Sequence, residues 1–421
     1  MRITFLTSFA SRGGMQRAAV SLTASWAEQG NEVCLLTVCH SQSPPYPLHP
    51  AVKLRSLGLT LQSQHSIPNL FRSLKRTWGV RTAIRETRPD VIVSFGTQIN
   101  IIALLATLGM PAPVIISERT DPSRSKIRPV WQALRPLVYP WANALVCLTS
   151  STLARFRAQI PVRGCVIPNF VTLPPSSAGA ALQQRKRSSR TLIAMGRLVT
   201  EKGFDTLLIA FSRIAAKHPD WSLSILGDGP LRSELEAQAL ALGLAHRVHF
   251  VGEVCDPFFL LHEADLFVLA SRFEGFPNAL CEAMACGLPA VSFDCPSGPA
   301  HIIRHGLDGI LVNPETSDAL AAALDRLMSN DQERAKLAAR APDVLRRFNS
   351  ERVLALWEAL FAEVAPRAEE YSSAAAPAKS GDQIVFACPS NTQETGRNHL
   401  SVTPSSVSKK PGNEILAESA P

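Results

Sequence analysis

Short apolar runs alternate with helical patterns along most of this chain, and that alternation limits the possible folds more than any other feature. Strands that alternate with helices predict a parallel sheet with helices on both faces. The pattern begins again near residue 191, so two such domains are expected. In the first half the expected strands are Ile3–Thr7, Glu32–Val38, Val52–Leu54, Val91–Ser94, Val114–Ser117, Ala144–Leu148 and Cys165–Ile167.

A stretch rich in proline, serine and basic residues separates the two halves and is interpreted as a linker, 171–190. We therefore expect domains at 1–170 and 191–349, a final helix at 350–365, and a tail at 366–421 whose composition is typical of disorder. The expected strands of the second half are Leu192–Ala194, Leu223–Leu226, Val248–Val251, Leu266–Ala270 and Ala290–Phe293. Helices alone are expected after Asn313, at Ser317–Met328, Asp331–Ala341 and Ser350–Val364.

The stretch from Asp265 to Val291 is predicted to form a strand, a loop, a helix, a turn and a second strand. Glu274 lies in the loop, and Glu282 lies about one turn into the helix. In a parallel sheet the loop after a strand's carboxyl end faces the ligand crevice, and a helix N-terminus attracts anions. This unit therefore predicts a ligand that carries hydroxyls and phosphates.

Two further loops carry groups that suit a diphosphate. Gly13 and Gly14 lie between the first strand and the first helix, where a backbone without Cβ atoms can approach a phosphate closely. Arg197 follows a strand and Lys202 precedes a helix, so these two cations could hold both phosphates and offset the charge of a leaving group. The alternatives are an ordinary turn for the glycines and solvent-exposed side chains for the cations.

The spacing Glu274-x7-Glu282 within FEGFPNALCEAMACGLPAV, together with GRLVTEKGF and the Gly-Gly loop, resembles the signature of the family 4 retaining glycosyltransferases. The resemblance runs from the first strand to about Ala365. It implies the GT-B fold, in which two Rossmann-like α/β domains face each other across a cleft. The first would bind the acceptor and the second the nucleotide-sugar, and the last helix, which carries Trp357, would cross back to the first domain.

The resemblance also implies roles for individual residues. Glu282 would accept hydrogen bonds from both ribose hydroxyls, and Glu274 would lie near the donor sugar. For Glu282 alone, the alternative is an ordinary surface position on a helix. Arg197, Lys202 and the Gly13–Gly14 backbone would stabilise the departing diphosphate. The backbone at Gly252, Glu253 and Val254 would hold the base, and that of Phe276, Pro277, Asn278, Ala279 and Leu280 would meet the sugar and the β-phosphate.

Three acid or base candidates, Glu118, Arg119 and Asp121, follow the strand Val114–Ser117. Members of the family often carry a histidine or an acid here, near the reacting sugar. Arg119 departs from that pattern and leaves a general base unassigned, and an ion pair between Glu118 and Arg119 is the structural alternative.

For other polar residues near the expected cleft, the sequence allows either a structural or a ligand-binding role. Asp228 either shapes its turn or contacts the ligand. Asp294 and Ser297 either contact the sugar or cap the next helix. The Pro-Ser-Gly-Pro turn around Ser297 resembles members that use UDP-sugars.

Charge is spread unevenly along the chain. Residues 1–170 hold 19 lysines and arginines against six acids, a net charge of +13, so the remainder of the +8 chain carries −5. Two basic and apolar segments, Asn69–Arg88 and Ser123–Trp141, are typical of helices that lie on anionic bilayers, although each could simply cover its own core. A nucleic-acid partner is disfavoured because these residues lack the context of a known binding motif. Nine cysteines without a CxxC pair indicate reduced thiols and a cytoplasmic protein.

Together these features predict a glycosyltransferase that forms an α-glycosidic bond with retention. The expected donor is a UDP-sugar such as UDP-GalNAc, UDP-GlcNAc, UDP-Gal or UDP-Glc, and the expected acceptor is a hydroxyl of a lipid-linked oligosaccharide or polysaccharide precursor. No cofactor is expected, since the sequence has no Asp-x-Asp metal site. We expect a cytoplasmic protein associated peripherally with the anionic inner membrane. The alternatives are a sugar-nucleotide epimerase, a GDP-mannose-dependent mannosyltransferase and a non-catalytic docking subunit.

Overall fold

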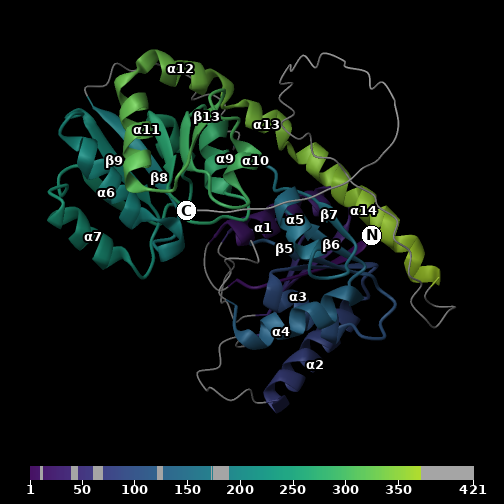
Figure 1. Ribbon diagram of the computed structural model, residues 1–421. Coiled ribbons are helices and arrows are strands. Elements are labelled where there is room, and N and C mark those ends of the chain that lie inside the picture. Colours follow the sequence, from purple (N-terminus) through teal and green to yellow (C-terminus); the bar gives the residue numbers. More distant parts are fainter. Residues whose placement is uncertain are drawn as a thin grey trace, which may run out of the picture. The chain divides into compact units, whose positions relative to one another are not determined.

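Two parallel β-sheets, each flanked by helices, make up most of the described chain (Figure 1). The computed structural model describes residues 1–9, 13–38, 46–59, 70–120, 127–171, 173 and 189–370, with only the backbone described at 70–75 and 366–370. This arrangement confirms the predicted α/β class. Most of the predicted linker and of the predicted tail, together with Asp121, lies outside the described residues.

The first sheet has seven parallel strands in the order β3-β2-β1-β4-β5-β6-β7. The order reverses between β1 and β4, and ligands of such sheets bind at the carboxyl ends of the strands near this reversal. The strands are β1 (Arg2–Thr7), β2 (Glu32–Thr37), β3 (Lys53–Ser56), β4 (Val91–Phe95), β5 (Val114–Glu118), β6 (Ala144–Cys147) and β7 (Gly164–Val166).

Apolar clusters on both faces of the first sheet pack against its helices. On one face, Phe5 of β1 meets Phe95 of β4 edge to face, with ring centroids 4.5 Å apart. The helices are α1 (Gly14–Glu28), α2 (Leu70–Thr87), α3 (Thr97–Ala106), α4 (Pro129–Val138) and α5 (Ser150–Arg157), followed after α4 by the short helix η1 (Tyr139–Trp141).

The last helix, α14 (Ser350–Glu370), joins the core of the first sheet rather than the second. Its Trp357 lies edge to face with Trp26 of α1, at 5.5 Å between centroids. Figure 1 shows α14 running beside the strands of the first sheet. The predicted return of the final helix, which carries Trp357, to the first domain is therefore confirmed.

The second sheet has six parallel strands in the order β10-β9-β8-β11-β12-β13. Its edge strand β13 (Gly309–Val312) is absent from the sequence prediction, although it is as long as the predicted strand Ala290–Phe293. It pairs with β12 (Ala290–Phe293) along its whole length. The remaining strands are β8 (Arg190–Met195), β9 (Trp221–Leu226), β10 (Val248–Gly252) and β11 (Leu266–Leu269).

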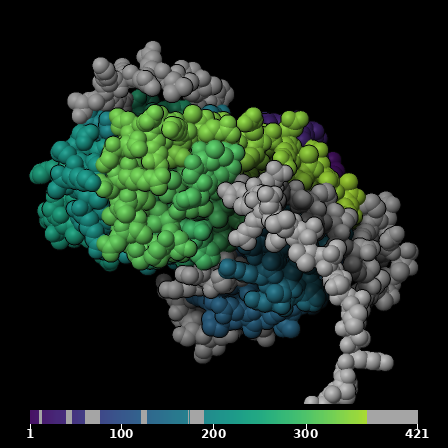
Figure 2. All heavy atoms as spheres, turned by 45° about the horizontal axis from the view of Figure 1, so that its top comes forward, coloured from purple at the N-terminus to yellow at the C-terminus, as the bar shows by residue number. Residues whose placement is uncertain are grey.

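Helices pack on both faces of the second sheet, and Figure 2 shows the atoms of the segment after β13, coloured light green, on the near surface of this domain. Leu320 and Leu324 of α11, the first helix of that segment, are fully buried in the main core of this domain. The helices are α6 (Phe204–Ala215), α7 (Arg232–Ala241), α8 (Phe258–Glu263), α9 (Asn278–Ala285), α10 (Pro299–Ile302), α11 (Ser317–Ser329), α12 (Asp331–Arg340) and α13 (Asp343–Arg347), with the short helix η3 (Thr200–Lys202) before α6.

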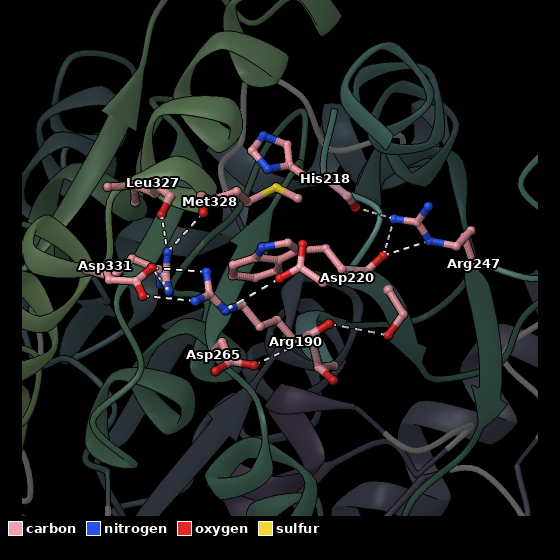
Figure 3. A network of polar contacts seen from close by, with 12 residues as sticks. Arg190, His218, Asp220, Arg247, Asp265, Leu327, Met328 and Asp331 are labelled. Atoms are coloured by element: carbon pink, nitrogen blue, oxygen red, sulfur yellow. Dashed lines mark hydrogen bonds and ion pairs between the residues drawn. The ribbon is translucent and has the colours of Figure 1, made fainter. Parts of the chain in front are cut away.

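Two arginines lie close to the buried ring of Trp221 at the start of β9. Figure 3 shows one of them, Arg190, beside Asp331 in a network of polar contacts. The guanidinium carbons of Arg190 and Arg334 lie 5.8 and 5.0 Å from the ring centroid. Both arginines also donate to Asp331, at 2.7 to 3.0 Å. The buried Arg334 guanidinium further donates to the carbonyls of Leu327 and Met328, at 2.6 and 3.2 Å, and so satisfies the end of α11.

Replacing Arg334 by alanine is expected to lower the free energy of unfolding of the second domain by about 2 kcal/mol, because two buried carbonyls lose their donor. Urea unfolding of both proteins measures the difference. Arg326→Ala is the matched control, since the Arg326 side chain is 59% exposed and its pair with Glu333 contributes little. Equal losses of unfolding free energy in the two variants would contradict the stabilising role given to the hydrogen bonds of Arg334.

Candidate functional site

A cleft of about 600 Å³ is lined by loops from both sheets. Most of these loops follow the carboxyl ends of strands, where parallel sheets place their ligands. The cleft brings together thirteen of the predicted residues, which the sequence spreads over 270 positions: Gly13, Gly14, Arg119, Arg197, Lys202, Glu253, Val254, Glu274, Phe276, Pro277, Asn278, Ala279 and Glu282.

Lys202 and Glu274 form an ion pair inside this cleft. Lys202 Nζ lies 2.5 Å from Glu274 Oε1, and the hydroxyl of Ser271 donates to the same oxygen at 2.7 Å. The Glu274 side chain is only 10% exposed, so its charge needs these donors. An anionic ligand that enters the cleft can compete with Glu274 for Lys202, because Ser271 would still donate to the carboxylate.

The loop that carries Lys202 is held in place by Arg272, a residue the sequence analysis did not single out. The backbone amide of Arg272 donates to the carbonyl of Glu201 at 2.9 Å, and its guanidinium donates to Asp205 at 2.6 Å. Gly203 then starts α6 with a φ of +65°, where a Cβ would lie 2.0 Å from the carbonyl oxygen of Ala270. The sequence could have indicated Arg272, since it lies two residues before Glu274 in the same loop.

Two glycines allow the loops to approach one another closely. A Cβ on Gly275 would lie 2.1 Å from the carbonyl oxygen of Arg119, and one on Gly14 would lie 2.9 Å from Nδ2 of Asn278. Real Cβ atoms do not approach other atoms so closely, so each position has room for glycine alone unless its neighbour shifts. Gly14, which the sequence assigned to phosphate approach, therefore also permits contact between protein loops.

A chain of hydrogen bonds connects Arg119 to the Gly-Gly loop. The Arg119 guanidinium donates to Oδ1 of Asn169, Asn169 Nδ2 donates to Asn278 Oδ1 at 2.7 Å, and Asn278 Nδ2 donates to the carbonyl of Gly14 at 3.0 Å. Burial lowers the pKa of Arg119 to about 9, and its guanidinium carbon lies 4.1 Å from the ring centroid of Phe95. Asn169 was missed by the sequence analysis, although its place shortly after the strand β7 was a usable signal.

Glu118 does not share the cleft with Arg119. It is buried on the other side of the strand end, where Thr97 donates to both carboxylate oxygens at 2.9 Å and the hydroxyl of Tyr139 donates to one of them. Burial raises the pKa of this carboxyl. No ion pair joins Glu118 to Arg119, because successive residues of a strand point to opposite faces. The structural alternative of a Glu118–Arg119 ion pair is therefore wrong, and Glu118 is also not placed to act on a ligand in the cleft.

Glu282 is paired with a residue that the sequence analysis did not assign. Arg17 Nη1 of α1 lies 3.0 Å from Glu282 Oε1 of α9, and both residues line the cleft. Burial raises the pKa of the Glu282 carboxyl, whereas the charge of Arg17 lowers it. The surface-helix alternative for Glu282 is therefore wrong, since its side chain is 10% exposed.

Several other predicted positions have structural tasks. The amide of Leu280 donates to the carbonyl of Pro277 at 3.1 Å, and its side chain is fully buried, which removes Leu280 from the cleft lining. The carbonyl of Gly252 accepts from the amide of Gly227 at 2.7 Å, and Gly252 also lies outside the lining. Asp228 both accepts from the amide of Gly229 at 2.6 Å and lines the cleft.

The residues after β12 do not cap the next helix as one expectation proposed. Ser297 instead donates from its hydroxyl to the carbonyl of Glu274 at 3.1 Å, and α10 has no side-chain cap. Asp294 directly follows β12, and its amide donates to the carbonyl of Val312 at 3.0 Å. Ser297 therefore helps to hold the backbone of the Glu274 loop in place.

Two doubly wound parallel-sheet domains, a cleft lined from both, and a last helix that packs on the first sheet define the GT-B architecture. The chain matches the family "Glycosyl transferases group 1" over residues 182–344 and "Glycosyl transferase 4-like domain" over residues 13–169. The chain belongs to the glycosyl transferases that these two family descriptions cover together.

The chain is 27% identical over 374 residues to a GalNAc-α-(1→4)-GalNAc-α-(1→3)-diNAcBac-PP-undecaprenol α-1,4-N-acetyl-D-galactosaminyltransferase of Campylobacter jejuni, with coverage of 86% of this chain and 99% of the relative. It is also 27% identical over 393 residues to an exopolysaccharide phosphotransferase of Streptomyces coelicolor. That match covers 88% of this chain but only 41% of the length of the Streptomyces relative.

Among solved structures, a mutant of S. aureus TarM, in complex with Fondaparinux, α-GlcNAc-glycerol and UDP, has a TM-score of 0.71. That chain is 12% identical, and the match covers 86% of this chain and all of that one. At this identity the likeness shows the fold.

Proposed function

We propose that this protein is a retaining glycosyltransferase that moves a sugar from a UDP-sugar to a hydroxyl of a lipid-linked oligosaccharide or polysaccharide precursor. The observation that carries the proposal is the Lys202–Glu274 pair, 2.5 Å long, in a cleft that Arg197 and Glu282 also line. Cations beside carboxylates suit a ligand with phosphates at one end and hydroxyls at the other.

The cations of the cleft would stabilise the departing diphosphate. Lys202 would leave Glu274 for a phosphate oxygen, and Arg197 and the backbone of Gly13 and Gly14 line the same cleft. Such donors act most strongly where charge develops in the transition state. We propose that these groups replace a divalent ion, so that transfer needs no metal and no other cofactor.

The buried position of Glu118 is compatible with retention of configuration. Glu118, the last residue of β5, points away from the cleft, so it is not placed to take the acceptor's proton as the base of an inverting enzyme would. The bond between the anomeric carbon and the β-phosphate oxygen would break while a bond to the acceptor oxygen forms on the same face. The acceptor's proton would pass to the departing phosphate oxygen, giving an α-linked product and a free nucleoside diphosphate.

The proposed acceptor follows from the relatives and from surface chemistry. The Campylobacter relative acts, by its name, on an undecaprenol-diphosphate-linked glycan. In the first domain α2, α3 and α4 pack side by side, and large apolar side chains nearby are exposed, with Trp78 at 68% and Leu137 at 65%. These residues and the +13 charge of residues 1–170 support peripheral binding to an anionic membrane.

Across the described ranges, no helix is both long enough and apolar enough to cross a bilayer.

The test is a donor panel of UDP-, GDP- and ADP-sugars, with polyprenyl-diphosphate-linked glycans as acceptors and with EDTA present. We expect one UDP-sugar to release UDP in proportion to product, and proton NMR of the product to show an α-anomeric signal. A β-linked product would refute retention, and loss of activity in EDTA would refute metal independence. Conversion of one sugar nucleotide into its epimer would favour the epimerase alternative.

A further inference from the structure

The pair between Arg17 and Glu282 is a contact in the cleft that the proposed mechanism does not use. Arg17 Nη1 lies 3.0 Å from Glu282 Oε1. The guanidinium also lies over two aromatic rings, 5.5 Å from the centroid of Phe258 and 5.9 Å from that of Tyr46. Arg17 is therefore held from several sides, in a position set by α1, α8 and the segment that contains Tyr46.

The pair leaves most of the carboxylate free for a ligand. An ionised carboxylate offers about four lone-pair sites, of which Arg17 uses one. Both hydroxyls of a ribose can therefore donate to Glu282 without displacing Arg17. A protonated Glu282 would instead carry a donor and lose acceptor capacity, so ribose binding depends on its ionisation.

We propose that Arg17 is a positioning residue of the donor site, which keeps the Glu282 carboxylate ionised and oriented to accept the ribose hydroxyls of a nucleoside diphosphate. The inference rests on the proposed function, because it assumes that a nucleotide donor occupies the cleft. It deepens that function by assigning the nucleotide-binding task of the second domain partly to a helix of the first.

The electrostatic setting of Glu282 makes this role testable by pH. Arg17 is the charged group that acts on its titration, and Cys281 and Cys286 are the titratable neighbours on its own helix. Asp256 influences Cys286, and Arg347 of α13 influences Cys281. Burial raises the pKa of both thiols, that of Cys286 to about 12, so they stay neutral.

Loss of Arg17 would raise the pKa of the Glu282 carboxyl further, because burial would act without its counter-charge. The ionised form would then be lost at a higher pH as the solution is acidified. Nucleotide affinity should fall about tenfold for each pH unit below that raised pKa.

The experiment is calorimetric titration of the full chain with UDP and with 2′,3′-dideoxy-UDP, from about pH 6 to about pH 8.5. For Arg17→Gln we expect UDP binding to weaken about tenfold or more at the acid end and to recover toward the alkaline end. Binding of the dideoxy nucleotide should change little, since it has no hydroxyls for Glu282. Arg17→Lys keeps the charge and should keep the pH profile of the unaltered protein.

Arg326→Gln, which removes a surface ion pair of the second domain, is the matched control and should leave both nucleotides unaffected. If Arg17→Gln weakens both nucleotides equally at every pH, Arg17 only holds helices together and the inference is overturned. A flat profile for UDP, unchanged from the unaltered protein, also overturns it. If the unaltered chain binds no nucleoside diphosphate, the proposed function fails, and this inference fails with it.

Discussion

Replacing Lys202 by alanine is expected to slow sugar transfer by at least about a hundredfold, because the charge of the leaving diphosphate loses a positioned cation. Glu274 would also lose the donor that lies 2.5 Å from its Oε1. The effect should appear in kcat more than in KM, since the cation matters most when the bond to phosphate is breaking. Steady-state kinetics with the donor identified by the panel measures it.

Lys217→Ala is the matched control for this variant. Lys217 is an exposed lysine of the same domain whose ammonium lies 2.7 Å from Asp325, so both variants remove one lysine and one ion pair. The control should transfer sugar at the rate of the unaltered protein. Similar rates for the two variants would show that Lys202 has no special part in the reaction.

Replacing Gly275 by alanine is expected to reduce transfer by about a hundredfold without unfolding the protein. The added Cβ would lie 2.1 Å from the carbonyl oxygen of Arg119, a backbone atom that cannot turn aside. The Glu274 loop must therefore move, and a displacement of about 1 Å at a reacting centre can cost that much in rate. Kinetics together with a circular dichroism melt separates lost activity from lost structure.

Gly79→Ala is the control for this substitution, because Gly79 lies within α2 and a Cβ there would meet nothing within 4 Å. Alanine favours a helix over glycine, so this variant should be fully active and slightly more stable. Full activity in Gly275→Ala would mean that the close approach of the two loops is not needed for transfer.

The architecture could be predicted from the sequence because it follows from local periods. Apolar runs of strand length, separated by helical patterns, already specify parallel sheets. Such sheets place the loops of Lys202 and Glu274 at one edge of the second sheet, and the loop of Gly13 at the corresponding edge of the first. The edge strand β13 was overlooked, although its apolar run is as long as that of the predicted strand Ala290–Phe293. The resemblance of the Glu274–Glu282 unit to a known family supplied the expected roles, which the fold alone would not.

What the sequence determined by itself is therefore the fold class and the loops that form the cleft. The tertiary structure decided which side chains meet there. Arg17 lies 265 positions before Glu282, and Asn169 lies 109 positions before Asn278, yet each pair is in contact. Glu118 and Arg119 are neighbours in sequence, yet they face different surroundings. Local patterns encode backbone conformation through short-range sterics and periodicity, whereas these pairings depend on how separate elements pack.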